Sequence, residues 1–129
     1  MQDKIKVLLV DDEADFTQPM SFWLRSKGYD VIVASNGEEG VKLVRQENPH
    51  IVFMDLNMPV LDGVQALRKI REFNTGLPVI IISAYLDDTR ISEANKMGIS
   101  GVFYKEKDFT EGLVLLETAL RIHKSLKKS

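Results

Sequence analysis

Several short apolar runs in the sequence end in a polar side chain that can take part in chemistry. The residues that follow these runs are the acids Asp11-Asp12-Glu13, the carboxylate of Asp55, the hydroxyl of Ser83 and the ammonium group of Lys105. Two ionised carboxylates about 4 Å apart repel each other by about 4 kcal/mol at an effective dielectric constant of 20. If these acids converge, their charge requires more positive charge than Lys105 alone supplies. A divalent ion that prefers oxygen ligands, Mg²⁺ in particular, meets that requirement.

The same set of groups is typical of phosphoryl transfer, with Asp55 as a candidate nucleophile that forms an aspartyl phosphate. Each residue also has a simpler explanation. Asp12 or Glu13 can cap a helix, Asp55 can form a turn before Pro59, and Lys105 can be a solvated lysine at a strand end. These explanations account for the residues one by one, but not for acids, a hydroxyl and an ammonium group at the ends of separate runs.

The apolar runs themselves have the composition of buried strands. They are short, rich in β-branched or aromatic residues and bounded by polar residues, Gly or Pro. They cover residues 5–10, 31–34, 51–54, 79–82 and 102–104. Such runs are typical of strands covered on both faces, as in a parallel sheet.

Stretches with the apolar spacing of helices separate these runs. The spaced residues are Phe16, Met20, Trp23, Leu24; Val41, Val44; Val64, Leu67, Ile70; Ile91, Ala94, Met97; and Leu113, Leu116, Leu120. Residues 36–39 and 108–111 have the spacing of a capping box, and Gly28 and Gly98 suit the position after a helix end. Pro19 lies inside the first stretch, so that helix either kinks there or begins later, with Thr17 as its cap.

Strand–helix alternation repeated five times predicts an α/β fold with a parallel sheet and right-handed crossovers. In a parallel sheet the residues just after the strands meet at one edge, and ligands bind in the crevice at that edge. The acids after the first and third runs, the serine and the lysine are therefore expected to lie together.

The composition is that of one globular domain. The chain has 129 residues, of which 44% are hydrophobic and 28% charged, values that do not predict disorder. The net charge of −2 gives no electrostatic reason to bind nucleic acid, and the absence of Cys excludes disulfides and thiolate metal sites. The first apolar run meets acids at once, so it predicts neither a signal peptide nor a membrane span. A cytoplasmic protein is expected.

Four segments, taken in order, match a known pattern. They are VLLVDDE (7–13), MDLNMPVLDG (54–63), LPVIIISA (77–84) and MGISGVFYK (97–105). Over about residues 4–120 the chain resembles the receiver domain of two-component response regulators, the CheY-like family. The resemblance implies a single (βα)₅ flavodoxin-like, three-layer fold with a five-stranded parallel sheet of order 2-1-3-4-5. It makes residues 1–129 one receiver domain, with residues 121–129 as a helix end or a linker.

The resemblance also implies a role for each site residue. Asp55 is the phospho-acceptor, Ser83 donates its hydroxyl to a phosphoryl oxygen, and Lys105 pairs with another. The implied Mg²⁺ ligands are Asp11, Asp12, Asp55 and the backbone carbonyl of Asn57.

The implied function is a phosphorylation-dependent signalling switch. A sensor histidine kinase or a histidine phosphotransfer protein supplies the phosphoryl group, and the face formed by the fourth helix, fifth strand and fifth helix then changes its affinity for a downstream effector protein or domain. Such a protein catalyses only its own phosphorylation and dephosphorylation. The resemblance leaves open a phosphorylation-dependent dimer, and whether the receiver stands alone or belongs to a longer regulator or hybrid kinase.

The residue after the lysine departs from the family. The family usually has a cis proline there, whereas this chain has Glu106. A cis bond before a non-proline residue costs about 2.5–4 kcal/mol, so the Lys105–Glu106 bond is expected to be trans. Lys107 then becomes a rival for the ammonium role, although the spacing from Gly98 favours Lys105.

A second departure concerns the switch. Val102 stands where the family commonly has an aromatic residue that rotates on phosphorylation, and strand alternation puts Tyr104 on the same face as Val102. Either Tyr104 substitutes for that aromatic residue, or the coupling runs through Ser83 alone. Asn57 and Tyr85 flank the expected phosphate site and are predicted to tune the lifetime of the phosphorylated state.

Three other functions remain as alternatives. A phosphohydrolase with an aspartyl nucleophile places a second Asp two residues later, but this chain has Asn57 there. A degenerate receiver that binds partners without phosphorylation is favoured by Glu106 and Val102 and disfavoured by the intact acids, serine and lysine. A flavodoxin-type FMN site needs Gly, Ser or Thr after the first strand, where this chain has acids.

Overall fold

The computed structural model describes residues 4–85 and 88–128, and over these residues strands and helices alternate as the sequence predicts. The strands are β1 (Lys6–Val10), β2 (Asp30–Ala34), β3 (Ile51–Asp55), β4 (Val79–Ser83) and β5 (Gly101–Tyr104). The helices are α1 (Ala14–Ser26), α2 (Gly37–Glu47), α3 (Gly63–Phe73), α4 (Arg90–Lys96) and α5 (Phe109–Lys128).

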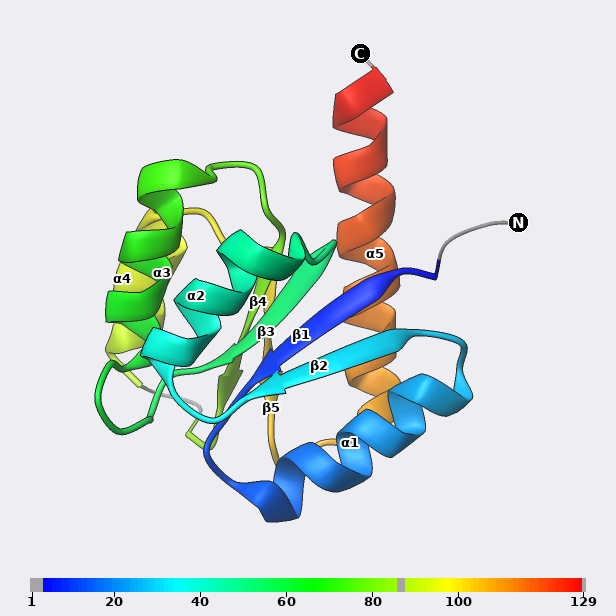
Figure 1. The fold of residues 1–129 in the computed structure, drawn as a ribbon, viewed down its shortest axis with the longest axis horizontal. Helices are drawn as coiled ribbons and strands as arrows, with labels where there is room; N and C mark the ends of the chain where they lie inside the picture. Colours follow the sequence, from blue (N-terminus) through cyan, green and yellow to red (C-terminus); the bar gives the residue numbers. More distant parts are fainter. Residues whose placement is uncertain (1–3, 86–87, 129) are drawn as a thin grey trace.

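The strands form one parallel sheet of order β2-β1-β3-β4-β5, which confirms the predicted topology. Helices α1 and α5 cover one face of the sheet, and α2, α3 and α4 cover the other (Figure 1). The result is a three-layer fold in which the carboxyl ends of all strands lie at the same edge.

The central strand β3 shows how the core fixes that edge. Phe53 is fully buried in the apolar cluster beneath α1 and α5, and its neighbour Met54 is fully buried in the cluster beneath α2 and α3. Alternate side chains of a strand point to opposite faces, and burying each such side chain contributes about 1.5–3 kcal/mol. Asp55 is therefore the last residue of a strand that is anchored on both sides.

The start of α1 differs from one of the two predicted arrangements. The helix begins at Ala14, and Thr17 is buried inside it, so the later start capped by Thr17 is wrong. Met20 and Leu24 are fully buried. The apolar surface that they bury outweighs the cost of Pro19, which removes one backbone hydrogen bond near the exposed start of the helix.

The other local signals agree with the structure in most details. Asn36 caps α2 by accepting a hydrogen bond of 2.8 Å from the amide of Glu39. Gly28 and Gly98 follow helix ends with φ of 98° and 84°, the left-handed region that favours glycine. Asp108 caps α5 through Thr110 and not through the predicted Glu111.

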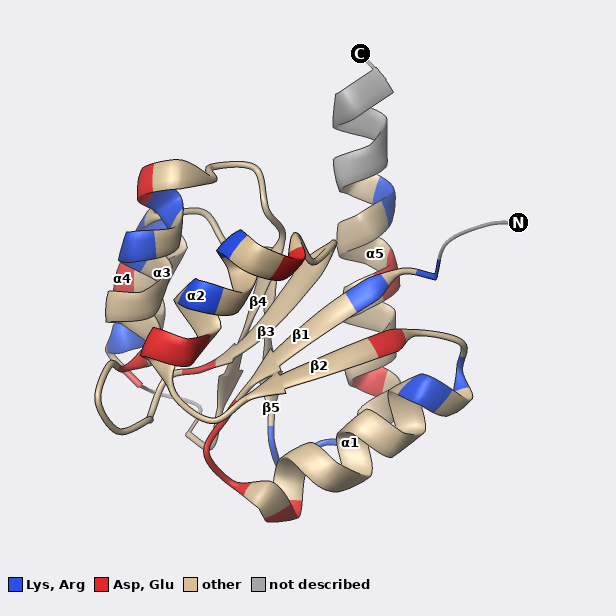
Figure 2. Cartoon of the chain, in the orientation of Figure 1, with Lys and Arg blue, Asp and Glu red and all other residues tan. Residues whose placement is uncertain are grey.

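Charged side chains are distributed unevenly over the fold. The strands are almost entirely uncharged, and both signs are interspersed on the helices (Figure 2). Acidic residues gather where β1 runs into α1, which is the edge that the sequence singles out. Over the described part of the chain, no helix combines the length and apolar character that a bilayer span requires.

Candidate functional site

Three carboxylates converge at the carboxyl edge of β1 and β3. Asp11 and Asp12 follow β1, Asp55 ends β3, and one carboxylate oxygen from each lies within 4.8 Å of the others. The two strands are neighbours, with Val10 paired to Met54, so the pairing register brings the acids together. Asp11 and Asp55 are only 2% and 3% exposed, whereas Asp12 is open to solvent.

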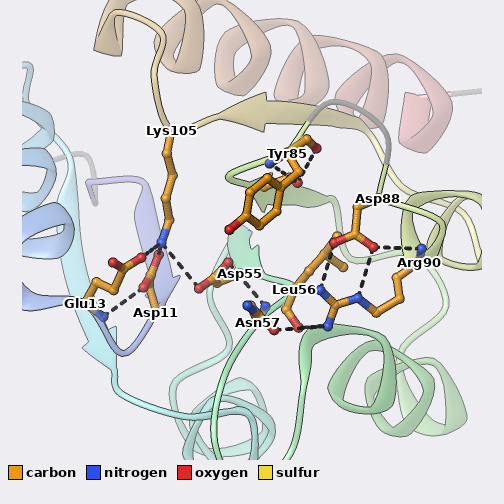
Figure 3. Close-up of polar contacts among 10 residues, drawn as sticks. Asp11, Glu13, Asp55, Leu56, Asn57, Tyr85, Asp88, Arg90 and Lys105 are labelled. Atoms are coloured by element: carbon orange, nitrogen blue, oxygen red, sulfur yellow. Dashed lines mark hydrogen bonds and ion pairs between the residues drawn. The ribbon is translucent and has the colours of Figure 1, made fainter.

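Lys105 closes the site from the end of β5. Its Nζ lies 2.9 Å from Oδ2 of Asp11 and 3.4 Å from Oδ2 of Asp55 (Figure 3). It also pairs with the carboxylate of Glu13. Lys107 lies in the following turn with an exposed side chain, so Lys105 is the lysine that the fold brings to the acids.

The pKa values of the site show that Lys105 alone does not neutralise the carboxylates. Burial raises the pKa of Asp55 to about 7, and the negative charge of Asp11 adds to this rise, while Lys105 offsets it only in part. Burial also raises the pKa of Asp11. For Lys105 burial acts to lower the pKa, but its close contacts with the carboxylates of Glu13 and Asp11 raise the pKa overall.

One oxygen of this cluster is poorly satisfied. Oδ2 of Asp11 is buried without a hydrogen-bond partner, because Lys105 approaches it as an ion pair without hydrogen-bonding alignment. A buried oxygen of this kind, next to two further carboxylates, is a suitable donor for a hard cation. The arrangement of the three acids therefore fits Mg²⁺.

The loop from β3 to α3 is folded tightly against the strand end. The amide of Gly63 donates to the carbonyl of Leu56 at 3.0 Å, and a Cβ at Gly63 would lie 2.2 Å from the carbonyl oxygen of Asp55. Only glycine fits at that position. The amide of Asn57 donates to Oδ1 of Asp55 at 3.4 Å, so the loop orients the carboxylate directly.

The loop also contains a strained residue. The amide of Leu61 donates to the carbonyl of Pro59 at 2.7 Å, which closes a three-residue γ-turn around Val60. Val60 has a φ of 69°, which is unfavourable for a β-branched side chain.

Ser83 ends β4 beside the acids, but its hydroxyl is turned toward its own loop. Its Oγ donates to the carbonyl of Tyr85 at 2.7 Å and accepts from the amide of Tyr85 at 3.1 Å. The side chain of Tyr85 is 62% exposed and lies above Asp55 at the mouth of the site (Figure 3). One pocket is lined by Asp12, Asp55, Ser83, Tyr85 and Lys105, together with Asn57, Ala84, Asp88 and Arg90.

Comparison with known proteins assigns this arrangement to a family. The response regulator receiver domain matches residues 7–117 of the chain. The chain belongs to this family. Its curated relatives include the regulatory protein AtoC of Escherichia coli (strain K12), which is 32% identical over 123 residues, and the transcriptional regulatory protein ZraR of the same organism, which is 33% identical over 118 residues.

These alignments cover 95% and 92% of this receiver domain but only 26% and 27% of the two relatives. The chain thus spans about a quarter of the length of these curated relatives.

Solved structures agree with the family. A CheY-like receiver domain from Methanospirillum hungatei aligns over 95% of this chain and 98% of that chain with a TM-score of 0.90, and at 20% identity it supports the fold alone. A chain of the CheX-CheY-BeF3-Mg+2 complex from Borrelia burgdorferi is 29% identical, with a TM-score of 0.82 and coverage of 88% and 87%. Receiver domains are signalling domains of two-component systems, and an acidic pocket that binds Mg²⁺ is typical of them.

Position 102 of β5 has valine where the family commonly has an aromatic residue, as the sequence indicates. Val102 packs against the apolar cluster on the α2–α4 face, and Tyr104 is half-buried beside Ser83 in the strand register. The amide of Lys105 donates to the carbonyl of Ser83 at 3.0 Å. The described residues contain no cis peptide bond, so the Lys105–Glu106 bond is trans, as predicted.

Two contacts of the receiver domain were absent from the sequence predictions. Glu13 precedes α1 but makes no side-chain cap, because its carboxylate reaches Lys105. Arg90, the first residue of α4, reaches the backbone of Leu56 in the β3–α3 loop. The acidic run of residues 11–13 could have pointed to the first contact. No sequence signal identifies the contact of Arg90 with Leu56, because every residue type has a backbone carbonyl.

Proposed function

We propose that this receiver domain is a phosphorylation switch in which Asp55 accepts a phosphoryl group from a phosphohistidine. The donor is a sensor histidine kinase or a histidine phosphotransfer protein, which places the reaction in the cytoplasm. The convergence of Asp11, Asp12 and Asp55 with Lys105 on one rigid edge of the sheet is the observation that supports the proposal most directly. The family to which the chain belongs is the second support.

In the proposed reaction an oxygen of Asp55 forms a bond to phosphorus while the bond from phosphorus to the histidine nitrogen breaks. The electron pair of that bond stays on the imidazole, which then takes up a proton. Asp11, Asp12, Asp55 and the backbone carbonyl of Asn57 would hold Mg²⁺, which supplies positive charge to the phosphoryl oxygens. Lys105 is already within 3.4 Å of Asp55 and pairs with a phosphoryl oxygen once it leaves Glu13.

Ser83 provides the proposed link to the switch. To donate to a phosphoryl oxygen, its hydroxyl has to give up the bond to the carbonyl of Tyr85, so the loop after β4 has to rearrange. The backbone amide of Lys105 donates to the carbonyl of Ser83, so a movement of the loop after β4 also moves the end of β5. Tyr104 lies on this path and is the candidate for the missing aromatic residue.

The α4–β5–α5 face is the surface that we propose to change its affinity for a downstream effector. A phosphorylation-dependent dimer through the same face is a second proposed outcome. Light scattering of the protein with beryllofluoride and Mg²⁺ distinguishes a dimer from a monomeric switch, because only a dimer doubles the measured mass.

Treatment with acetyl phosphate and Mg²⁺ tests the phosphorylation site. Intact-mass spectra of the native protein should gain one phosphate, and Asp55→Ala should gain none. Asp30→Ala, which changes an exposed acid at the opposite edge of the sheet, is the matched control and should gain one phosphate. A phosphate on Asp55→Ala would refute the proposed site.

A degenerate receiver that acts without phosphorylation is the alternative function. It is favoured by Val102 and Glu106, which replace the usual switch residues. An unmodified native protein after treatment with acetyl phosphate and Mg²⁺, together with unchanged NMR spectra on addition of beryllofluoride, would favour this alternative.

A further inference from the structure

Arg90 ties the start of α4 to the loop that follows Asp55. Its Nη1 donates to the carbonyl oxygen of Leu56 at 3.1 Å and to Oδ1 of Asn57 at 3.4 Å (Figure 3). Its Nε and Nη2 donate to the two oxygens of Asp88 at 3.0 and 2.8 Å. This two-point pairing with Asp88 fixes the plane of the guanidinium group, so Arg90 meets the loop in one orientation.

The peptide group between Leu56 and Asn57 is held at both of its ends. Its carbonyl oxygen accepts from Arg90 and from the amide of Gly63, and its N–H donates to Oδ1 of Asp55. A peptide group is planar, so fixing the carbonyl end also fixes the direction of the N–H. Arg90 thereby helps to orient the carboxylate of Asp55 without touching it.

The next carbonyl along the chain is that of Asn57, the backbone ligand assigned to Mg²⁺ in the proposed function. Arg90 also holds the side chain of Asn57, because Nη1 of Arg90 donates to Oδ1 of Asn57. With the preceding peptide group and the side chain both held, little freedom remains in the direction of the Asn57 carbonyl.

We propose that Arg90, held by Asp88, is a positioning residue for the magnesium site. It fixes the Leu56–Asn57 peptide group, and through it the metal-binding arrangement of the Asn57 carbonyl and the Asp55 carboxylate. The inference rests on the proposed function, since it assumes that Mg²⁺ binds at these acids. It adds a residue on α4 to a site built from the ends of β1, β3, β4 and β5.

The charge of Arg90 acts in the opposite direction, which makes the proposal testable. A cation near Asp55 repels Mg²⁺, so a purely electrostatic role predicts that removing Arg90 strengthens metal binding. A positioning role predicts that removing Arg90 weakens metal binding. It also predicts that Arg90→Lys is defective, because lysine keeps the charge but cannot pair with Asp88 and Leu56 through a fixed planar fork.

Calorimetric titration with Mg²⁺ distinguishes the two roles. Arg90→Lys and Arg90→Gln should each weaken Mg²⁺ binding by about 10-fold, the size typical of groups that orient metal ligands. Arg68→Gln is the matched control, because Arg68 pairs α3 with Glu93 of α4 at an exposed position away from the acids, and its affinity should stay within about twofold of the native value. An Arg90→Lys protein that binds Mg²⁺ like the native protein, or an Arg90→Gln protein that binds it more tightly, would overturn the proposal.

Two further readouts separate positioning from a general loss of structure. In the acetyl phosphate reaction the Mg²⁺ concentration for half-maximal rate should rise about 10-fold in the Arg90 variants, while the rate at saturating Mg²⁺ stays at the native level. A loss of folded protein would instead lower the saturating rate. The amide of Asn57 should exchange its hydrogen faster in both variants than in Arg68→Gln.

If the Arg90 variants do not fold, Asp88→Asn tests the positioning role of Arg90. It leaves Arg90 in place but removes the carboxylate that fixes the guanidinium plane, and the proposal requires weaker Mg²⁺ binding in this variant too. Native affinity in a folded Asp88→Asn protein would count against the proposal. If the native protein itself binds no Mg²⁺, the proposed function fails, whereas native binding with unaffected variants makes only the role of Arg90 wrong.

Discussion

Removing the negative charge of Asp55 should stabilise the metal-free protein. Asp55 is 3% exposed and lies beside Asp11, and its pKa is about 7, compared with 3.8 for an unperturbed aspartate. The ionised carboxylate is therefore less favourable in the folded protein than in the unfolded chain. Asn has nearly the same shape without the charge, so Asp55→Asn removes the unfavourable charge and keeps the packing.

The magnitude follows from the proton affinity. Each tenfold change in proton affinity corresponds to about 1.4 kcal/mol, so at pH 8 the ionised Asp55 destabilises the fold by at most about 4 kcal/mol. The pKa of about 7 already includes the attraction of Lys105. Because the amide of Asn has N–H donors that must also leave water, we expect a net gain of about 2 kcal/mol in the free energy of unfolding. Between pH 4 and 7 the folded protein binds more protons at Asp55 than the unfolded chain does, so the native free energy of unfolding falls as the pH rises through this range.

Urea unfolding in EDTA at pH 8 and at pH 5, followed by circular dichroism, measures these differences. The gain from Asp55→Asn should be largest at pH 8 and fall below half of that value at pH 5, where the native carboxyl is mostly protonated. Asp30→Asn is the control, because Asp30 is exposed at the opposite edge, and it should change the stability by less than about 0.5 kcal/mol. An Asp55→Asn protein that is no more stable than the native protein at pH 8, or a gain that does not depend on pH, would refute the reasoning.

Four further substitutions test the loop after β3 and the choice of lysine. Gly63→Ala should lower the free energy of unfolding by about 3 kcal/mol, because the new Cβ would lie 2.2 Å from the carbonyl oxygen of Asp55; equal urea midpoints for the two proteins would contradict this. Val60→Gly should raise it by about 1 kcal/mol, because glycine relieves the strain at φ of 69°, and a lower midpoint would show that the strain is absent. Lys105→Gln should weaken beryllofluoride binding by about 10-fold in NMR titrations, whereas Lys107→Gln should bind it like the native protein; the reverse result would transfer the ammonium role to Lys107.

The sequence predicts the site because its main features depend on residue type and on topology. A run of β-branched and apolar residues such as 51–54 strongly favours a buried strand. Parallel strands then have their carboxyl ends at one edge of the sheet. Asp11 and Asp55 come together because β1 and β3 are also neighbours in that sheet. Within the described residues, the meeting of Lys105 with the acids follows from the same topology, whereas the sheet order was implied by the family resemblance and is confirmed by the structure.

What the sequence does not reveal depends on side-chain conformation and backbone contacts. The rotamer of Ser83, which turns its hydroxyl to Tyr85, is set by a loop whose shape the residue types do not specify. The sequence does not decide where α1 begins for a related reason. A local signal, the possible cap at Thr17, competed with a start at Ala14, which buries Thr17 inside the helix and packs Phe16 against the apolar cluster beneath α1 and α5.

The structure holds the two side chains proposed to bind the phosphoryl group in other contacts. Lys105 pairs with Glu13 and Asp11, and Ser83 bonds to the backbone of Tyr85. A modification shifts a conformational equilibrium only as far as its contacts differ between the two states. In the proposed phosphorylated state both side chains exchange these contacts for phosphoryl oxygens, so the released partners mark the segments that move. These segments are the start of α1, through Glu13, and the loop after β4, through Tyr85. In the proposed phosphorylated state a change at Asp55 also reaches α4 through Arg90, which contacts the carbonyl of Leu56 next to Asp55.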